Sequence, residues 1–148
     1  MIIEKLNKEE YAGKKFTLRY FTKGYYDIEK TENGFSFTYK KFAEMTEMSF
    51  SDVFFNEWLE NPVAYGAFEN GELLGYVEGT LEAWNQRYRI SNICVFDERK
   101  RHCGIGTMLM NVILDEAEKS GARMVVLETQ TCNENAIAFY KKNGFDII

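Results

Sequence analysis

The spacing of apolar and polar residues predicts mostly β-strands in the first two thirds of the chain. Residues 16–42 are dense in Phe, Tyr and Thr and contain the turn signal Glu-Asn-Gly at 32–34. Residues 63–84 predict a hairpin, because two apolar runs flank a second Glu-Asn-Gly sequence. Residues 88–96 predict a further strand.

One helix is expected within this strand-rich part. Residues 49–62 predict a short helix, with Ser51 as its N-cap and Pro62 marking its end.

The period of the pattern changes at Gly104, where apolar residues begin to recur at i, i+3, i+4 and i+7. This spacing predicts an amphipathic helix that ends at Gly121. Residues 123–130 then predict a buried strand, and residues 133–145 a second helix. Asn133 can cap that helix, and Gly144 can close it in the left-handed conformation.

Together these elements predict one α+β domain over residues 1–148. Four or five antiparallel strands are followed by strand–helix–strand–helix, so we expect a mixed, largely antiparallel sheet with helices on both faces. The strands at 88–96 and 123–130 should be parallel across the helix between them.

Composition narrows the classes of function. The chain has 148 residues, 45% of them apolar and 28% charged, as expected of a globular domain. Its net charge of −5 argues against nucleic-acid binding and is compatible with a small cationic substrate. No apolar run reaches membrane-spanning length, so we expect no membrane association. No P-loop motif is present.

Cysteine and histidine usage argues against a metal centre. The three cysteines, Cys94, Cys103 and Cys132, show no CxxC spacing and suggest reduced thiols in the cytosol. His102 is the only histidine, which excludes a histidine-rich metal site. We therefore expect a cytoplasmic protein without a metal.

The segment RKRHCGIGTML, residues 99–109, has the features of an anion site. The helix that follows has no acid in its first turn, and Lys100 and Arg101 lie beside its start. Exposed backbone N–H groups at a positive helix end suit a phosphate or pyrophosphate. Gly104 and Gly106 let an anion approach without a Cβ in the way. A plain glycine-rich turn between strand and helix is the alternative.

A dinucleotide-binding fold fits this segment less well. It requires GxGxxG directly after the strand and an acid about twenty residues on, a role that Glu128 could take. However, Leu109 occupies the position of the third glycine, and the first half of the chain is antiparallel.

The segment resembles the acyl-CoA loop of the GNAT acetyltransferases, with Arg101, Gly104 and Gly106 in its marked positions. Asn133 follows 29 residues after Gly104 and opens NENAIAFYKKNGF, which resembles the NxxAxxFYxxxGF segment of the same superfamily. The resemblance covers residues 63 to 148. Within the superfamily, LETQ at 127–130 and Trp84-Asn85 resemble the streptothricin acetyltransferases.

The resemblance implies a reaction and a set of residues. The reaction is direct transfer of acetyl from acetyl-CoA to a primary amine of a small cationic molecule, here streptothricin, which would make this an antibiotic-resistance enzyme. Tyr140 would protonate the departing thiolate. The residues expected to bind acetyl-CoA are Ile93, Cys94, Val95, Arg101, His102, Cys103, Gly104, Ile105, Gly106, Thr107, Asn133, Ala136 and Phe139.

The general base is where this sequence departs from the family. Many members have acids on the fourth strand, but Ser91 and Asn92 stand there in this chain. This leaves Glu128, Glu78 and Glu82 as candidates for the base, and we expect Glu128, within LETQ, to have this role. Glu78, Glu82 and Trp84 are expected to contact the substrate, since the two glutamates share one face of their strand.

Two further expectations concern the whole protein. The family normally continues with two more strands beyond NGFDII, which ends at Ile148. We therefore expect the chain to be truncated or completed by a partner, and a homodimer is possible. A non-catalytic acyl-CoA-binding module of the same fold is the rival hypothesis, favoured by Ser91 and Asn92. The sequence does not identify the acceptor.

Overall fold

The turn signals and apolar periods of the chain lead to seven strands, three α-helices and one 3-10 helix in the computed structural model, which describes residues 1–148. The strands are β1 (Ile2–Lys5), β2 (Lys15–Thr31), β3 (Gly34–Val53), β4 (Val63–Glu69), β5 (Glu72–Glu82), β6 (Arg87–Val95) and β7 (Met124–Leu127). The helices are α1 (Lys8–Tyr11), the 3-10 helix η1 (Glu98–Lys100), α2 (Ile105–Lys119) and α3 (Glu134–Lys142).

These elements belong to two compact units, which we describe separately. The first unit comprises residues 1–18 and 50–127 and contains the main sheet with α2. The second comprises residues 19–49 and 128–148, which include most of the long β2–β3 hairpin, and α3.

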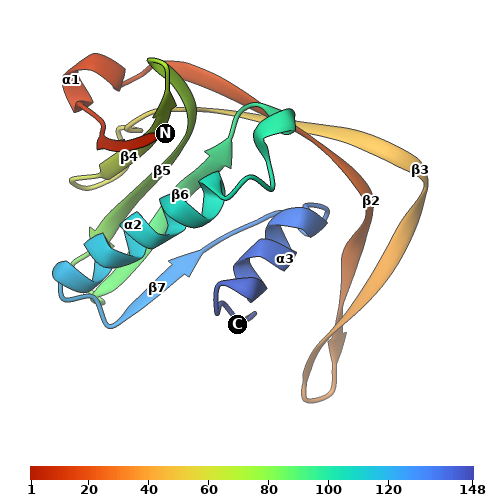
Figure 1. The fold of residues 1–148 in the computed structure, drawn as a ribbon. Helices are drawn as coiled ribbons and strands as arrows, with labels where there is room; N and C mark the ends of the chain where they lie inside the picture. Colours follow the sequence, from red (N-terminus) through yellow and green to blue (C-terminus); the bar gives the residue numbers. More distant parts are fainter. The chain divides into compact units, whose positions relative to one another are not determined.

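The main sheet has five strands in the order β1-β4-β5-β6-β7 (Figure 1). Every neighbouring pair is antiparallel except β6 and β7, which are parallel and are joined through α2. The predicted α+β class, the largely antiparallel sheet and the parallel final pair are thus confirmed.

Helices lie on both faces of this sheet, as predicted. On one face, α2 packs along β4, β5 and β6 through an apolar stripe of Ile105, Leu109, Met110, Ile113 and Ala117. The other face holds an aromatic core centred on Phe16, Phe54 and Tyr76. Tyr11 of α1 packs on this second core, 5.4 Å from Phe54 between ring centroids.

A β-bulge interrupts β6 where its partner β7 ends. Glu78 of β5 is paired with Asn92, but Gly79 is paired with Ile90, so Ser91 is the extra residue. On its other side, β6 pairs with β7 only as far as Ile90 and Leu127. From Ser91 onward β6 is therefore paired with β5 alone. Its other edge, the open edge of β6, has no strand partner there.

The second unit is held together by contacts between the hairpin and the segment around α3. Glu134 accepts hydrogen bonds from the Lys23 backbone N–H, at 2.9 Å, and from the Tyr39 hydroxyl, at 2.5 Å. Asn133 caps α3 as predicted, accepting from the Ala136 N–H, and Gly144 has the expected positive φ of 91°.

The predicted helix at 49–62 is wrong. Strand β3 continues to Val53, and turns follow up to Pro62. Phe54 and Phe55 are adjacent and both buried, and Phe55 has a φ of 51°, which a right-handed helix does not allow. Burial of both rings in the tertiary structure therefore overrides the local capping signals.

Two smaller differences concern strands. The final strand is shorter than the predicted 123–130, because its pairing with β6 covers only Met124–Leu127, and it is half-buried at most positions. Strand β1 and helix α1 were not predicted.

Candidate functional site

The glycine turn ends in a helix start with no side-chain cap. Gly104 is the N-cap of α2 with a φ of 87°, and the first turn of α2 contains no acid. His102 also has a positive φ, 65°, so the loop adopts a left-handed conformation at two positions. In this turn His102, Cys103, Gly104 and Thr107 are exposed, Gly106 is half-buried, and Ile105 is buried. An anion is the ligand that such a helix end favours.

The turn is joined to the open edge of β6 by Arg101. Its Nε donates to the carbonyl oxygen of Val95, at 3.1 Å. Val95 and Ile93 are half-buried, and Cys94 between them is buried, with a thiol whose pKa burial raises. The residues expected to contact the acyl chain thus lie on the part of β6 without a β7 partner.

A buried carboxyl group lies beneath the bulge of β6. Glu78 is 0% exposed, and its Oε2 accepts the Phe55 backbone N–H at 2.8 Å. The hydroxyl of Ser91 donates to the main-chain oxygen of Glu78 at 3.1 Å and lies 3.5 Å from its Oε1. Burial raises the pKa of this carboxyl to about 7; the Phe55 N–H opposes the rise, the Asp52 carboxylate adds to it, and the Ser91 hydroxyl opposes it.

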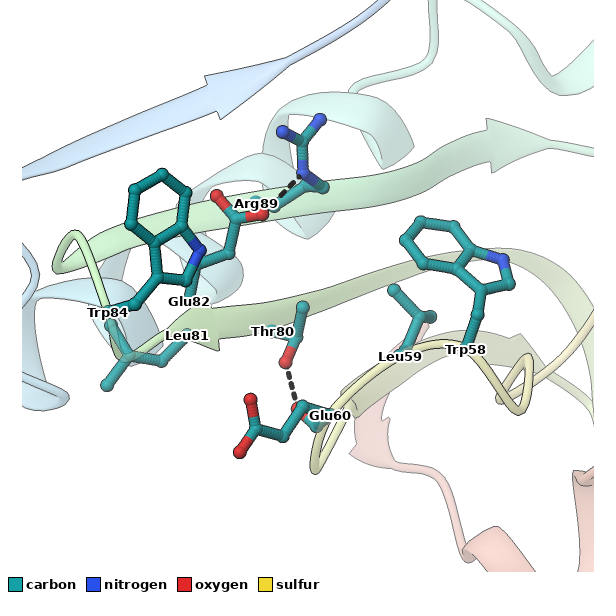
Figure 2. A pocket seen from close by; sticks show the side chains of 8 residues that line it. All are labelled: Trp58, Leu59, Glu60, Thr80, Leu81, Glu82, Trp84 and Arg89. Carbon is teal, nitrogen blue, oxygen red and sulfur yellow. Dashed lines mark hydrogen bonds and ion pairs between the residues drawn. The ribbon is translucent and has the colours of Figure 1, made fainter.

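A shallow pocket of about 160 Å³ opens further along the same two strands (Figure 2). Its lining includes the indoles of Trp58 and Trp84, which are 67% and 83% exposed. The carboxylate of Glu82 is paired with Arg89 at 3.1 Å and with Arg87 at 3.0 Å. Desolvation would raise the pKa of Glu82, but these two arginines lower it below its ordinary value.

The structure therefore places the three expected substrate contacts in different surroundings. Trp84 lies at the surface, Glu82 is neutralised by arginines, and Glu78 is below the surface. A role for them in substrate binding stays a prediction.

The remaining candidates belong to the second unit. Tyr140 and Phe139 lie on α3, half-buried, with ring centroids 5.8 Å apart, and Tyr140 is 6.1 Å from Phe145. Ala136 lies in the first turn of α3, where its N–H is bound by the cap Asn133. Glu128 follows β7 directly and is exposed.

The model of the Acetyltransferase (GNAT) family matches residues 23–145. The chain belongs to this family. It is 40% identical over 83 residues to a streptothricin acetyltransferase of Streptomyces lavendulae, covering 56% of this chain and 42% of that protein. It is 35% identical over 106 residues to N-alpha-acetyltransferase 50 of Danio rerio, covering 68% of this chain and 62% of that protein. The chain thus spans about half the length of these curated relatives.

Solved structures show the same fold. A nourseothricin acetyltransferase superposes with a TM-score of 0.78 at 22% identity, over 99% of this chain and 83% of that one. A putative streptothricin acetyltransferase from Bacillus anthracis str. Ames, in complex with acetyl coenzyme A, gives 0.72 at 22% identity, over 99% and 82%. None of the helices in this GNAT domain combines the length and apolar character needed to cross a bilayer.

The sequence did not indicate how Glu78 is surrounded. Its contacts come from Phe55, 23 residues earlier, and from Ser91, 13 residues later. Asp52 is fixed nearby by hydrogen bonds from the Val53 N–H and the Asn92 amide. The predicted helix at 49–62 gave no reason to expect Asp52 and Phe55 beside Glu78. The one signal available was the pair Ser91 and Asn92 in place of the family's acids.

Proposed function

We propose that this chain transfers the acetyl group of acetyl-CoA to a primary amine of a small cationic molecule. The observation that carries the proposal is the junction of β6 with α2. There, a strand with one open edge leads through a glycine turn into an uncapped helix start without acids. Membership of the GNAT family supports it.

Acetyl-CoA fits the residues of this junction. Its pyrophosphate would lie on the backbone N–H groups of Cys103–Thr107, with the charge of Arg101 beside them. The pantetheine arm would follow β6 past Ile93–Val95, and a backbone N–H of this stretch would stabilise the carbonyl oxygen. The family resemblance also assigns Asn133, Ala136 and Phe139 to acetyl-CoA binding.

The chemistry requires proton movements at two positions. A lysine-like amine with a pKa near 10.4 needs roughly 4–5 kcal/mol to lose its proton at neutral pH, so a general base is needed. From the resemblance, Tyr140 would protonate the departing thiolate. Glu128 is the base that the sequence motif suggests; the geometry around Glu78 leads to a different assignment below.

A cationic acceptor suits the pocket of Figure 2. Its lining includes the acid Glu60, whereas the other acid, Glu82, is already paired with Arg87 and Arg89. Trp58 and Trp84 offer exposed ring faces, on which cations bind favourably. The 40% identity with a streptothricin acetyltransferase makes streptothricin the acceptor that we propose.

A coupled assay of CoA release tests this function. The purified chain is given acetyl-CoA with streptothricin, spermidine, an aminoglycoside or a peptide with a free N-terminus. We expect turnover with streptothricin and weaker or no turnover with the others. Turnover of the peptide alone would contradict streptothricin as the acceptor and assign peptide N-termini instead. Tight acetyl-CoA binding in calorimetry without turnover of any amine would favour the non-catalytic binding module.

A further inference from the structure

Glu78 has the surroundings of a proton acceptor rather than of a substrate contact. The groups that face its carboxyl are two hydrogen-bond donors, the Phe55 N–H and the Ser91 hydroxyl, and one acid, Asp52. A buried carboxylate without a cationic partner is costly, so such a group readily takes a proton. Tyr76, two residues earlier on the same face, stays protonated because burial raises its pKa.

The two oxygens of Glu78 have different roles. Oε2 accepts a hydrogen bond from the backbone N–H of Phe55, a residue with a left-handed backbone and a φ of 51°. A bulky residue in this conformation is held there by the surrounding structure. Oε1 faces the Ser91 hydroxyl at 3.5 Å, and Ser91 is half-buried while Glu78 is fully buried. The hydroxyl that faces Oε1 thus belongs to a side chain that lies nearer the surface.

Ser91 lies at the point where the reaction is expected. It is the bulge residue of β6, and the pairing of β6 with β7 ends at Ile90. Its hydroxyl hydrogen can rotate from the main-chain oxygen of Glu78, 3.1 Å away, toward Oε1. Two residues that line the pocket lie close by along the strands. Thr80 is two positions after Glu78 on β5, and Arg89 is two positions before Ser91 on β6, a spacing of about 7 Å along a strand.

We propose that Glu78 accepts the proton of the acceptor ammonium through the hydroxyl of Ser91. The ammonium N–H gives its proton to Ser91 Oγ while the Ser91 O–H proton passes to Glu78 Oε1. The serine is unchanged, the carboxylate becomes a carboxylic acid, and the neutral amine can attack the thioester. Ser91 is the residue that contacts the amine, and Glu78 is a positioning residue that acts through it.

This inference rests on the proposed acetyltransferase function and explains a departure from the family. Acids that many members have on this strand are replaced by Ser91 and Asn92. Glu78, paired with Asn92 on the neighbouring strand, supplies a carboxyl group at the same level of the sheet. The pKa of about 7 fits this role, since a base is most effective when its pKa is near the working pH.

The pH dependence of kcat/KM tests the proposal. For the parent protein we expect a rise that levels off near pH 7. Glu78→Gln should lower kcat/KM by about 10²–10⁴-fold at pH 7.5, which is the usual contribution of a positioned base. The loss should shrink about tenfold per pH unit toward pH 10, because the amine then loses its proton to water. A purely structural defect would be the same at every pH.

Matched variants distinguish the relay from damage to the fold. Ser91→Ala should shift the profile in the same way, whereas Ser91→Thr, which keeps the hydroxyl, should restore it. Glu72→Gln changes an exposed glutamate of the same strand and should match the parent. If Glu78→Gln does not fold, the comparison of Ser91→Ala with Ser91→Thr decides.

The proposal is overturned if Glu78→Gln and Ser91→Ala keep the parent's pH profile, or if Glu128→Gln alone removes its rise near pH 7. A parent protein that turns over no amine contradicts the proposed function itself. The two failures are distinguishable, because in the first case the parent still releases CoA.

Discussion

At the scale of single residues, Glu78 combines a proposed role in catalysis with a cost in stability. Burial of the side chain holds its pKa at about 7 in the folded protein, against 4.5 for an unperturbed glutamate. Because the folded-state pKa is raised, the native protein retains a proton that the unfolded chain releases between these two values. The free energy of unfolding should therefore fall as the pH rises from about 4.5 to about 7.

Glu78→Gln removes this dependence. The shift from 4.5 to about 7 corresponds to about 3 kcal/mol. The difference in free energy of unfolding, variant minus parent, should therefore increase by about that amount when the pH is raised from 4.5 to 8. Urea unfolding at both pH values measures it. Glu72→Gln, on the exposed part of β5, is the control, and an equal trend in both variants would contradict the explanation.

Tyr140 gives a second prediction at this scale. Tyr140→Phe keeps the ring that contacts Phe139 and Phe145, so helix packing and acetyl-CoA affinity should hardly change. If its hydroxyl protonates the thiolate, kcat and kcat/KM should fall equally, by about 10²–10⁴-fold. Steady-state kinetics and calorimetry test this. A large loss of acetyl-CoA affinity with an unchanged kcat would instead make Tyr140 a binding residue.

At the scale of elements, the start of α2 is the feature on which we expect acetyl-CoA binding to depend. Its first turn has no acid and Gly104 provides no side-chain cap, so the positive helix end is not neutralised from within. The rest of α2 is fixed by buried apolar residues, among them Ile105 directly after the cap. The turn is thus exposed to a ligand while its helix is anchored on the sheet.

Gly106→Glu places a negative side chain at this helix end. A carboxylate there suits the helix dipole, so the fold should be kept, but it would compete with a pyrophosphate for the same N–H groups. We expect acetyl-CoA binding to weaken at least tenfold in calorimetry. Asp115→Asn, near the far end of α2, is the control. Unchanged affinity in Gly106→Glu would show that the anion does not bind at this turn.

At the scale of the whole molecule, the two family motifs belong to different compact units. The glycine turn and β6 lie in the unit of residues 1–18 and 50–127, while Asn133 and Tyr140 lie in the unit of residues 19–49 and 128–148. Each unit has contacts between segments far apart in the sequence. Asp52 with Asn92 is an example in the first, and Tyr39 with Glu134 in the second.

The sequence by itself determined the elements whose signals are local. The Glu-Asn-Gly turns marked the hairpins, the i, i+3, i+4 spacing marked α2, and Asn133 and Gly144 marked the ends of α3. The acid-free start of α2 and the parallel pairing of β6 with β7 also followed from the order and spacing of residues.

Only the tertiary structure decided what depends on distant partners. It turned residues 54–62 from an expected helix into turns, because Phe54 and Phe55 are adjacent and both enter the aromatic core. It also placed Glu78 under the bulge at Ser91, within reach of Phe55. A buried carboxyl group owes its chemistry to such neighbours, and hydrogen bonds between residues 13 and 23 positions apart leave no periodic pattern in a sequence.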